Sequence, residues 1–93
     1  MLNEKVLVTT QHRGVFFGTL IDDSGTTVTL KDARNCIYWD VTTKGFLGLA
    51  TTGPGPGCRV GPAAPELRLF GVTSVGRCTA EAVAAWERAP WSK

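Results

Sequence analysis

The sequence predicts a mainly β domain, folded as a small antiparallel β-barrel or a strongly bent sheet with one short C-terminal helix. Three observations support this fold class. Short runs rich in β-branched and aromatic residues alternate with polar, glycine-containing turns. A run with clear helix start and stop residues lies near the C-terminus. The length of 93 residues fits a single domain, residues 1–93, around one core.

A β meander is expected over residues 5–50, and its first half has the clearest pattern. Residues 5–10 and 15–21 read as two strands joined by a polar turn, and Gly18 is expected to bend the second strand. Residues 26–30 alternate threonine with valine and leucine, which is typical of a half-buried strand. The three strands therefore follow one another as an antiparallel series.

The second half of the meander is less regular. Polar residues 32–35 are expected to interrupt the sheet before a short fourth strand at residues 36–39. Residues 45–50 fit a strand or the first turn of a helix, and their two glycines favour the extended form. Residues 51–65 are rich in glycine and proline and predict a long surface loop, because proline cannot donate to a strand ladder.

The C-terminal third predicts strands and then a helix. Residues 66–78 read as one or two strands kinked at Gly71 and Gly76. Residues 79–89 predict the helix, because Thr79 is a good N-cap and Pro90 would stop the helix. The apolar stripe expected on this helix consists of Ala82, Val83 and Trp86.

Charge and cysteine content exclude several classes of protein. Ten lysines and arginines against eight acidic residues give a net charge of +2, which is too small to indicate a nucleic-acid or membrane partner. No apolar run reaches the roughly 18 residues of a membrane span, and no signal peptide is recognisable, so we expect a protein of the cytoplasm. Cys36, Cys58 and Cys78 are odd in number and widely spaced, which predicts small buried thiols.

Catalysis and metal binding are not favoured by the residue pattern. His12 is the one residue whose ordinary pKa suits proton transfer near neutral pH, and no local nucleophile motif accompanies it. The pair Asp22 and Asp23 is expected to form a hairpin turn rather than to hold a metal ion. We therefore expect a protein that is not an enzyme and has no cofactor or metal.

Several blocks of the sequence resemble a known family. They are His-Arg-Gly-Val-Phe-Phe-Gly at residues 12–18, Asp-Ala-Arg-Asn-Cys-Ile-Tyr-Trp at residues 32–39 and Gly-Phe-Leu-Gly-Leu-Ala at residues 45–50. Together they resemble a family of short, uncharacterised phage and prophage proteins along nearly the whole chain. The resemblance implies an accessory protein that acts on the host, with no activity or site to carry over.

A second, weaker similarity concerns the fold. Residues 6–33 have the strand order of Sm-like and SH3-like small barrels. Sm-like proteins begin with a helix and bind RNA with a late Arg-Gly pair, whereas this helix is C-terminal and only Gly76-Arg77 stands near the expected region. Fold similarity would not define the function.

Arginines and aromatic residues make up the candidate ligand site. Arginine offers a forked donor for phosphate, and aromatic rings offer faces on which a base can stack. The candidate ligand-binding residues are His12, Arg13, Arg34, Asn35, Tyr38, Trp39 and Arg59. The turn at 12–14 and the segment 32–35 are expected to lie near the same end of the sheet, with the loop that carries Arg59 as a lid. The alternative is that the arginines are surface residues and the aromatics belong to the core or a subunit interface.

These observations lead to one functional hypothesis and two alternatives. The first is a non-catalytic phage anti-defence protein that binds and sequesters a nucleotide-type immune messenger, such as a cyclic or ADP-ribose-type nucleotide, in the host cell cytoplasm. The second is a protein-binding module that inhibits a host protein or serves phage assembly. The third is an Sm-like nucleic-acid binder. A homo-oligomer is expected in each case, because so small a chain gains burial by association.

Overall fold

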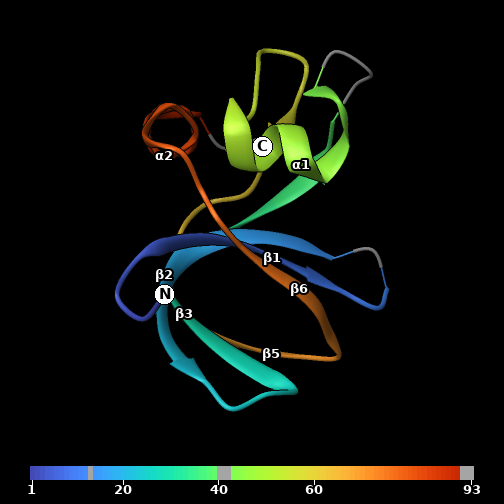
Figure 1. Ribbon diagram of the computed structural model, residues 1–93. Helices are drawn as coiled ribbons and strands as arrows, with labels where there is room; N and C mark the ends of the chain where they lie inside the picture. The colour runs from blue at the N-terminus through green and yellow to red at the C-terminus, as the bar shows by residue number, and fades with distance from the viewer. Residues whose placement is uncertain (13, 40–42, 91–93) are drawn as a thin grey trace.

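The computed structural model describes residues 1–12, 14–39 and 43–90, and its secondary structure is mainly antiparallel β (Figure 1). The strands are β1 (Lys5–Thr10), β2 (Val15–Asp23), β3 (Thr27–Tyr38), β4 (Arg59–Val60), β5 (Ala64–Phe70) and β6 (Val72–Arg77). The helices are α1 (Gly45–Thr51) and α2 (Ala80–Arg88). The predicted β-rich class is confirmed, although the described residues contain two helices where one was expected.

The six strands form one strongly bent sheet that is not closed into a barrel. Its order is β4-β3-β2-β1-β6, and β5 pairs with β3 beside this path. The register of β2 against β3 shifts between Phe17 and Thr19, so the bend expected at Gly18 is confirmed. A Cβ atom at Gly18 would lie 3.0 Å from the Lys31 carbonyl oxygen, which explains why glycine is needed at this close approach.

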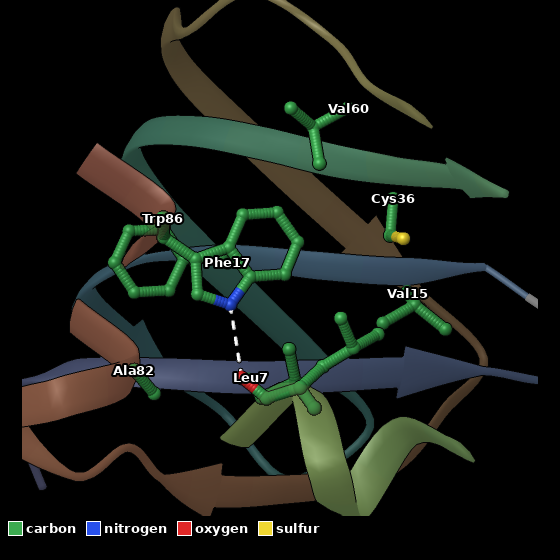
Figure 2. Close-up of a cluster of buried hydrophobic side chains, with 8 residues drawn as sticks. Leu7, Val15, Phe17, Cys36, Val60, Ala82 and Trp86 are labelled. Atoms are coloured by element: carbon green, nitrogen blue, oxygen red, sulfur yellow. Dashed lines mark hydrogen bonds between the residues drawn. The ribbon is translucent and has the colours of Figure 1, made fainter. Parts of the chain in front are cut away.

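The bend gives the sheet two buried faces. One face lies inside the curl of the strands, and its buried residues are Val6, Val8, Leu20, Val28, Leu30, Ala33 and Leu69. We call this set the curl core. The other face is covered by α1, α2 and β4, and its buried residues are Leu7, Val15, Phe17, Cys36, Leu49, Val60, Ala82 and Trp86 (Figure 2). We call this set the helix-side core. Since successive residues of a strand point to opposite faces, β1 supplies both cores.

The expected interruption at residues 32–35 is wrong, because β3 runs without a break from Thr27 to Tyr38. Asp32 adopts a positive φ of 53° inside the strand. Aspartate tolerates this left-handed conformation better than most residues do. The polar residues therefore produce a local irregularity in a long strand, and the fourth strand expected at residues 36–39 is the end of β3.

The extended form favoured for residues 45–50 is also wrong, because Gly45–Thr51 is helix α1. Its two glycines have positional roles that local propensity does not reveal. Gly45 enters the helix with a φ of 73°, and a Cβ atom at Gly48 would overlap the Thr43 carbonyl oxygen. Leu49 is fully buried in the helix-side core. Tertiary packing thus outweighs the low helix propensity of glycine.

The predicted loop over residues 51–65 is shorter than expected. Its first residue ends α1, and Arg59–Val60 pairs with β3 as strand β4. Strand β5 begins at Ala64 with a proline next to it, a position that an edge strand tolerates. The expected kink at Gly71 is confirmed as the corner between β5 and β6, with a φ of 64°. The kink expected at Gly76 is wrong, because Gly76 keeps a regular register with Leu7 inside β6.

The predicted C-terminal helix is confirmed as α2. The Thr79 hydroxyl accepts a hydrogen bond from the Ala82 amide at 3.1 Å and so caps the first turn. Of the predicted stripe, Ala82 and Trp86 are buried and Val83 is half-buried, while Glu87 and Arg88 are exposed. None of the helices in the described ranges is long and apolar enough to cross a membrane.

Candidate functional site

A cavity of about 570 Å³ opens between α1 and the β1–β6 edge of the sheet. Two aromatic side chains line it, Trp39 after the end of β3 and Phe46 in α1. Trp39 also packs against the helix-side core, which holds it from one side. Phe46 remains 42 % exposed. The cavity therefore has aromatic walls contributed by two separate elements.

Apart from Gly14 and Val15, the remaining described lining of this aromatic cavity is polar and uncharged. Hydroxyl and amide groups come from Thr9, Thr10, Gln11, Thr73 and Ser74. The Thr9 hydroxyl lies 2.7 Å from the Thr73 hydroxyl and 2.5 Å from the Ser74 hydroxyl. Hydroxyl and amide groups can both donate and accept hydrogen bonds, so they can bind a ligand that carries donors as well as acceptors.

The structure divides the predicted site residues among three places. These are the aromatic cavity, the contacts of Arg34 and Asn35 with Gly61, and a pocket lined by Tyr38 and Arg59. Trp39 lies in the aromatic cavity. Exposed His12 follows Gln11, a residue of the cavity lining, although His12 itself is not part of that lining. Arg13 lies outside the described residues.

Arg34 is largely buried, with 8 % of its surface exposed, and it lines a pocket of about 320 Å³ together with Lys5 and Glu87. Its Nε donates to the Gly61 carbonyl oxygen at 2.7 Å, and its Nη1 donates to the Trp86 carbonyl oxygen at 2.5 Å. Burial lowers the pKa of the Arg34 guanidinium from its ordinary value. Arg34 therefore ties the loop after β4 and the end of α2 to β3, and we assign it to the fold.

Asn35 stands opposite Phe16 in the β2–β3 register, and its carbonyl oxygen accepts the Gly61 amide at 2.9 Å. A Cβ atom at Gly61 would lie 2.3 Å from the Asn35 Oδ1 atom. The Asn35 side chain is exposed to solvent on one side and lies close to Gly61, the residue after β4, on the other. This contact holds β4 in place and lies outside the aromatic cavity.

Tyr38 and Arg59 form the third place. They are partners in the β3–β4 register, and together with Ile37 they line a shallow pocket of about 270 Å³. Tyr38 is 55 % exposed, so the alternative of a core position is wrong for this residue. Arg59 is held in strand β4 next to β3 and does not line the aromatic cavity.

The sequence pattern missed most of the aromatic cavity. Its polar groups come from β1 and β6, and Thr9 and Ser74 are 65 residues apart in the chain. Phe46 is not among the predicted site residues, and the extended form expected for residues 45–50 would not have placed it over the sheet. Only the pairing of β1 with β6 could have identified these residues.

No cluster of three or more metal-ligating side chains occurs in the described ranges. Asp22 and Asp23 act in the turn as expected, since their carboxylates accept hydrogen bonds from the Ser24 hydroxyl and the Gly25 amide, both at 3.1 Å. Cys36, Cys58 and Cys78 are free thiols.

Two of these thiols have a raised pKa. Burial, with a smaller contribution from neighbouring Cys58, raises the pKa of the Cys36 thiol to about 12. Burial likewise raises the pKa of Cys78 to about 11. Since the thiolate is the reactive form, neither residue is prepared to act as a nucleophile.

Comparison with known proteins identifies a family. No curated protein and no solved structure matches the chain. Residues 3–86 match a family described as a domain of unknown function, DUF6948. The predicted membership of an uncharacterised family is thereby confirmed, while a phage source and the similarity to Sm-like barrels stay predictions. The match covers nearly the whole chain, which therefore belongs to the DUF6948 family.

Proposed function

We propose that this protein is a non-catalytic phage accessory protein with an anti-defence role. It binds and sequesters a nucleotide-type immune signalling molecule in the host cell cytoplasm. The observation that supports the proposal is the aromatic cavity, in which Trp39 and Phe46 face a set of uncharged hydrogen-bonding groups. Cavities with apolar walls and a few convergent polar groups are the usual form of small-molecule sites.

The walls of the cavity suit a flat heterocycle such as a nucleobase. Aromatic side chains stack on bases with about 1–3 kcal/mol per base, whatever the base. The volume of about 570 Å³ lies in the ordinary range for small ligands, roughly 300–1,000 Å³. The base would lie against Trp39 and Phe46, while the hydroxyls of Thr9 and Ser74 would contact its polar edge.

Sequestration without turnover follows from the chemistry of the lining. The described lining residues offer hydroxyl and amide groups but no carboxylate, imidazole or thiol. A hydroxyl becomes a nucleophile only beside a general base, and none lies within this set. A bound nucleotide would thus be held unchanged.

The test is a titration with cyclic and ADP-ribose-type nucleotides, followed by thermal unfolding and calorimetry. A true ligand at about 100 times its dissociation constant adds roughly 2.7 kcal/mol of stability. Phe46→Ala should weaken binding about 5- to 150-fold, the equivalent of one base stack of 1–3 kcal/mol. Phe46 is the first choice because its partial exposure makes the variant compatible with folding.

Tyr38→Ala is the matched control, because Tyr38 is an exposed aromatic residue outside the cavity. It should bind as tightly as the natural chain. If no nucleotide stabilises the protein, or if the two variants weaken binding equally, the proposed site is wrong.

A protein-binding function is the second candidate. It is supported by exposed apolar side chains along the surface, which are Ile37, Tyr38, Phe46, Leu47 and Phe70. Exposed apolar groups of this kind mark contact surfaces when they cluster. A pull-down would test this function, and a specific partner should be retained by the natural chain but lost from Leu47→Lys. The Sm-like nucleic-acid alternative would instead show affinity that falls steeply with salt.

A further inference from the structure

Strand β6 is a free edge of the sheet. Its register with β1 pairs Val6 with Arg77, Leu7 with Gly76 and Val8 with Val75. The Cys78 amide donates to the Lys5 carbonyl oxygen, so residues 74, 76 and 78 direct their backbone groups toward β1. The alternate residues Val75 and Arg77 direct theirs away from it. In the described ranges, no hydrogen bond joins these outward groups to another part of the chain.

The other edge strands of the sheet have features that prevent pairing with another chain, and β6 lacks them. Strand β4 is only two residues long. Strand β5 carries Pro65, Glu66 and Arg68. Short length, proline and charge are the usual devices against edge-to-edge pairing. Strand β6 reads Val-Thr-Ser-Val-Gly-Arg, with no proline and a single charge at its end. Its irregular pairing is confined to the other end, near Thr10.

Apolar side chains of α1 flank the same edge. A groove of about 210 Å³ lies between α1 and β6, and its lining includes Phe46, Leu47, Ser74 and Gly76. Leu47 is 68 % exposed. A neighbouring strand would lie about 4.8 Å beyond β6, within reach of these side chains. At Gly76 an added Cβ atom would meet nothing closer than the Leu7 carbonyl oxygen at 4.0 Å, so this face is open.

We propose that the occupant of this edge is a second copy of the chain, with the two β6 strands paired antiparallel about a two-fold axis at Gly76. Each Val75 then exchanges backbone hydrogen bonds with the partner's Arg77. No like charges face each other, because Arg77 stands opposite valine and is already paired with Glu4 of its own chain at 2.6 Å. Each copy supplies both the free edge and the apolar cover, which is the condition for an isologous interface.

The consequence is a continuous sheet through both copies with Phe46 and Leu47 of each copy near the axis. The surface buried between the two copies adds to the limited core that a 93-residue chain can form. The interface adjoins the aromatic cavity, since Phe46 and Ser74 line both, but the dimer is measured without any nucleotide and its test is therefore separate from the binding test. It assigns a definite interface to the homo-oligomer expected from the sequence.

The test measures the molar mass of the full chain by sedimentation over a wide range of concentrations. The natural chain should sediment as a dimer. Leu47→Lys should raise the dimer dissociation constant at least about tenfold, since each dimer carries the substitution twice. Ile37→Lys is the matched control, because Ile37 is 58 % exposed but lies on β3 beside β4. It should leave the dimer unchanged.

A cross-link tests the register. Directly opposed residues in a non-hydrogen-bonded pair have Cα atoms about 4.5 Å apart, which a disulfide can span. Gly76→Cys should therefore form a covalent dimer on mild oxidation. Arg59→Cys, on the β4 edge, is the control and should give no more covalent dimer than the natural chain does. A monomer at all concentrations, or a dimer that tolerates Leu47→Lys and does not cross-link at residue 76, would overturn the proposal. A monomer that binds a foreign strand at β6 would also overturn it.

Discussion

The two cores of this molecule share strand β1 but differ in how they are held together. The curl core consists of aliphatic side chains from paired strands. In the helix-side core, the Phe17 and Trp86 rings stack with centroids 5.0 Å apart, and Trp86 Nε1 donates to the Leu49 carbonyl oxygen at 3.0 Å (Figure 2). The curl core is thus positioned by the sheet itself, whereas the helix-side core depends on directional contacts between distant segments.

This difference matters for the candidate site. Trp39 and Ala50 pack against the helix-side core, and α1 is joined to α2 through the Trp86 indole. Burial of apolar surface is non-directional, so it alone does not orient a helix on a sheet. Hydrogen bonds to fixed carbonyl groups do orient it. We expect the cavity to be more sensitive to changes in the helix-side core than to changes in the curl core.

The largest expected effect comes from Trp86→Ala. The variant removes a fully buried ring, its stack on Phe17 and its hydrogen bond to Leu49. Such truncations cost about 3–5 kcal/mol, a large share of the stability of a small domain. Urea unfolding followed by circular dichroism measures the loss. Trp86→Phe keeps a ring but leaves the Leu49 carbonyl unpaired, so it should lose about 1–3 kcal/mol. A Trp86→Phe variant as stable as the natural chain would mean that the hydrogen bond contributes nothing, and equal losses for the two variants would mean that the buried ring contributes nothing.

Leu30→Ala tests the curl core. Leu30 is fully buried there, and its truncation should lower the free energy of unfolding by about 2–5 kcal/mol. Because β1 supplies both cores, the unfolding curves from tryptophan fluorescence and circular dichroism should shift together. Leu2→Ala is the control, since Leu2 is 59 % exposed and should change stability by less than about 0.5 kcal/mol. Separate transitions for the two probes would show that the cores unfold independently.

Arg34→Met tests whether the helix-side core depends on its polar contacts. The variant keeps a similar apolar stem but loses the donors to the Gly61 and Trp86 carbonyls. Hydrogen bonds from charged groups contribute about 1.5–3 kcal/mol, and we expect a loss of that size in urea unfolding. Exposed Arg59→Met should be nearly neutral. Similar stability of the two variants would contradict a structural role for Arg34.

Near neutral pH the smallest effect comes from Cys36, whose contribution to stability depends on pH only in the alkaline range. Its pKa rises from the ordinary value of 9.0 to about 12 in the folded chain. Between these values the unfolded chain releases a proton that the folded chain keeps, so stability falls as pH rises. The slope is at most about 1.4 kcal/mol per pH unit for one thiol. Alkaline unfolding of Cys36→Ala should show a shallower slope than the natural chain. An unchanged slope would contradict this linkage.

Local patterns predicted the parts of the fold that local chemistry controls. The strands at residues 5–10 and 15–21 follow from β-branched residues between polar turns. The bend at Gly18 and the cap at Thr79 follow from single residues with particular conformational or hydrogen-bonding roles. Each of these features depends on contacts within the local stretch or on one neighbouring strand, which is why sequence reasoning reached them.

The errors occurred where contacts outside the segment override its local preference. Residues 45–50 looked extended because glycine disfavours helix, yet Gly48 is required there by the approach of the Thr43 carbonyl. The polar stretch in β3 looked like a break, yet β2 on one side and β5 on the other carry the strand through it. In both cases the deciding partner lies outside the segment that was read.

Alternation, turns and caps are local properties, and they are enough to predict a small β-rich domain with a C-terminal helix. The burial of Arg34 is not predictable in this way, since the carbonyls that hold it lie 27 and 52 residues away. Only the tertiary structure decided that Trp39 and Phe46 line one cavity while Tyr38 and Arg59 line another pocket. The physical reason is that side-chain partners across a bent sheet depend on the register of strands that are far apart in the chain.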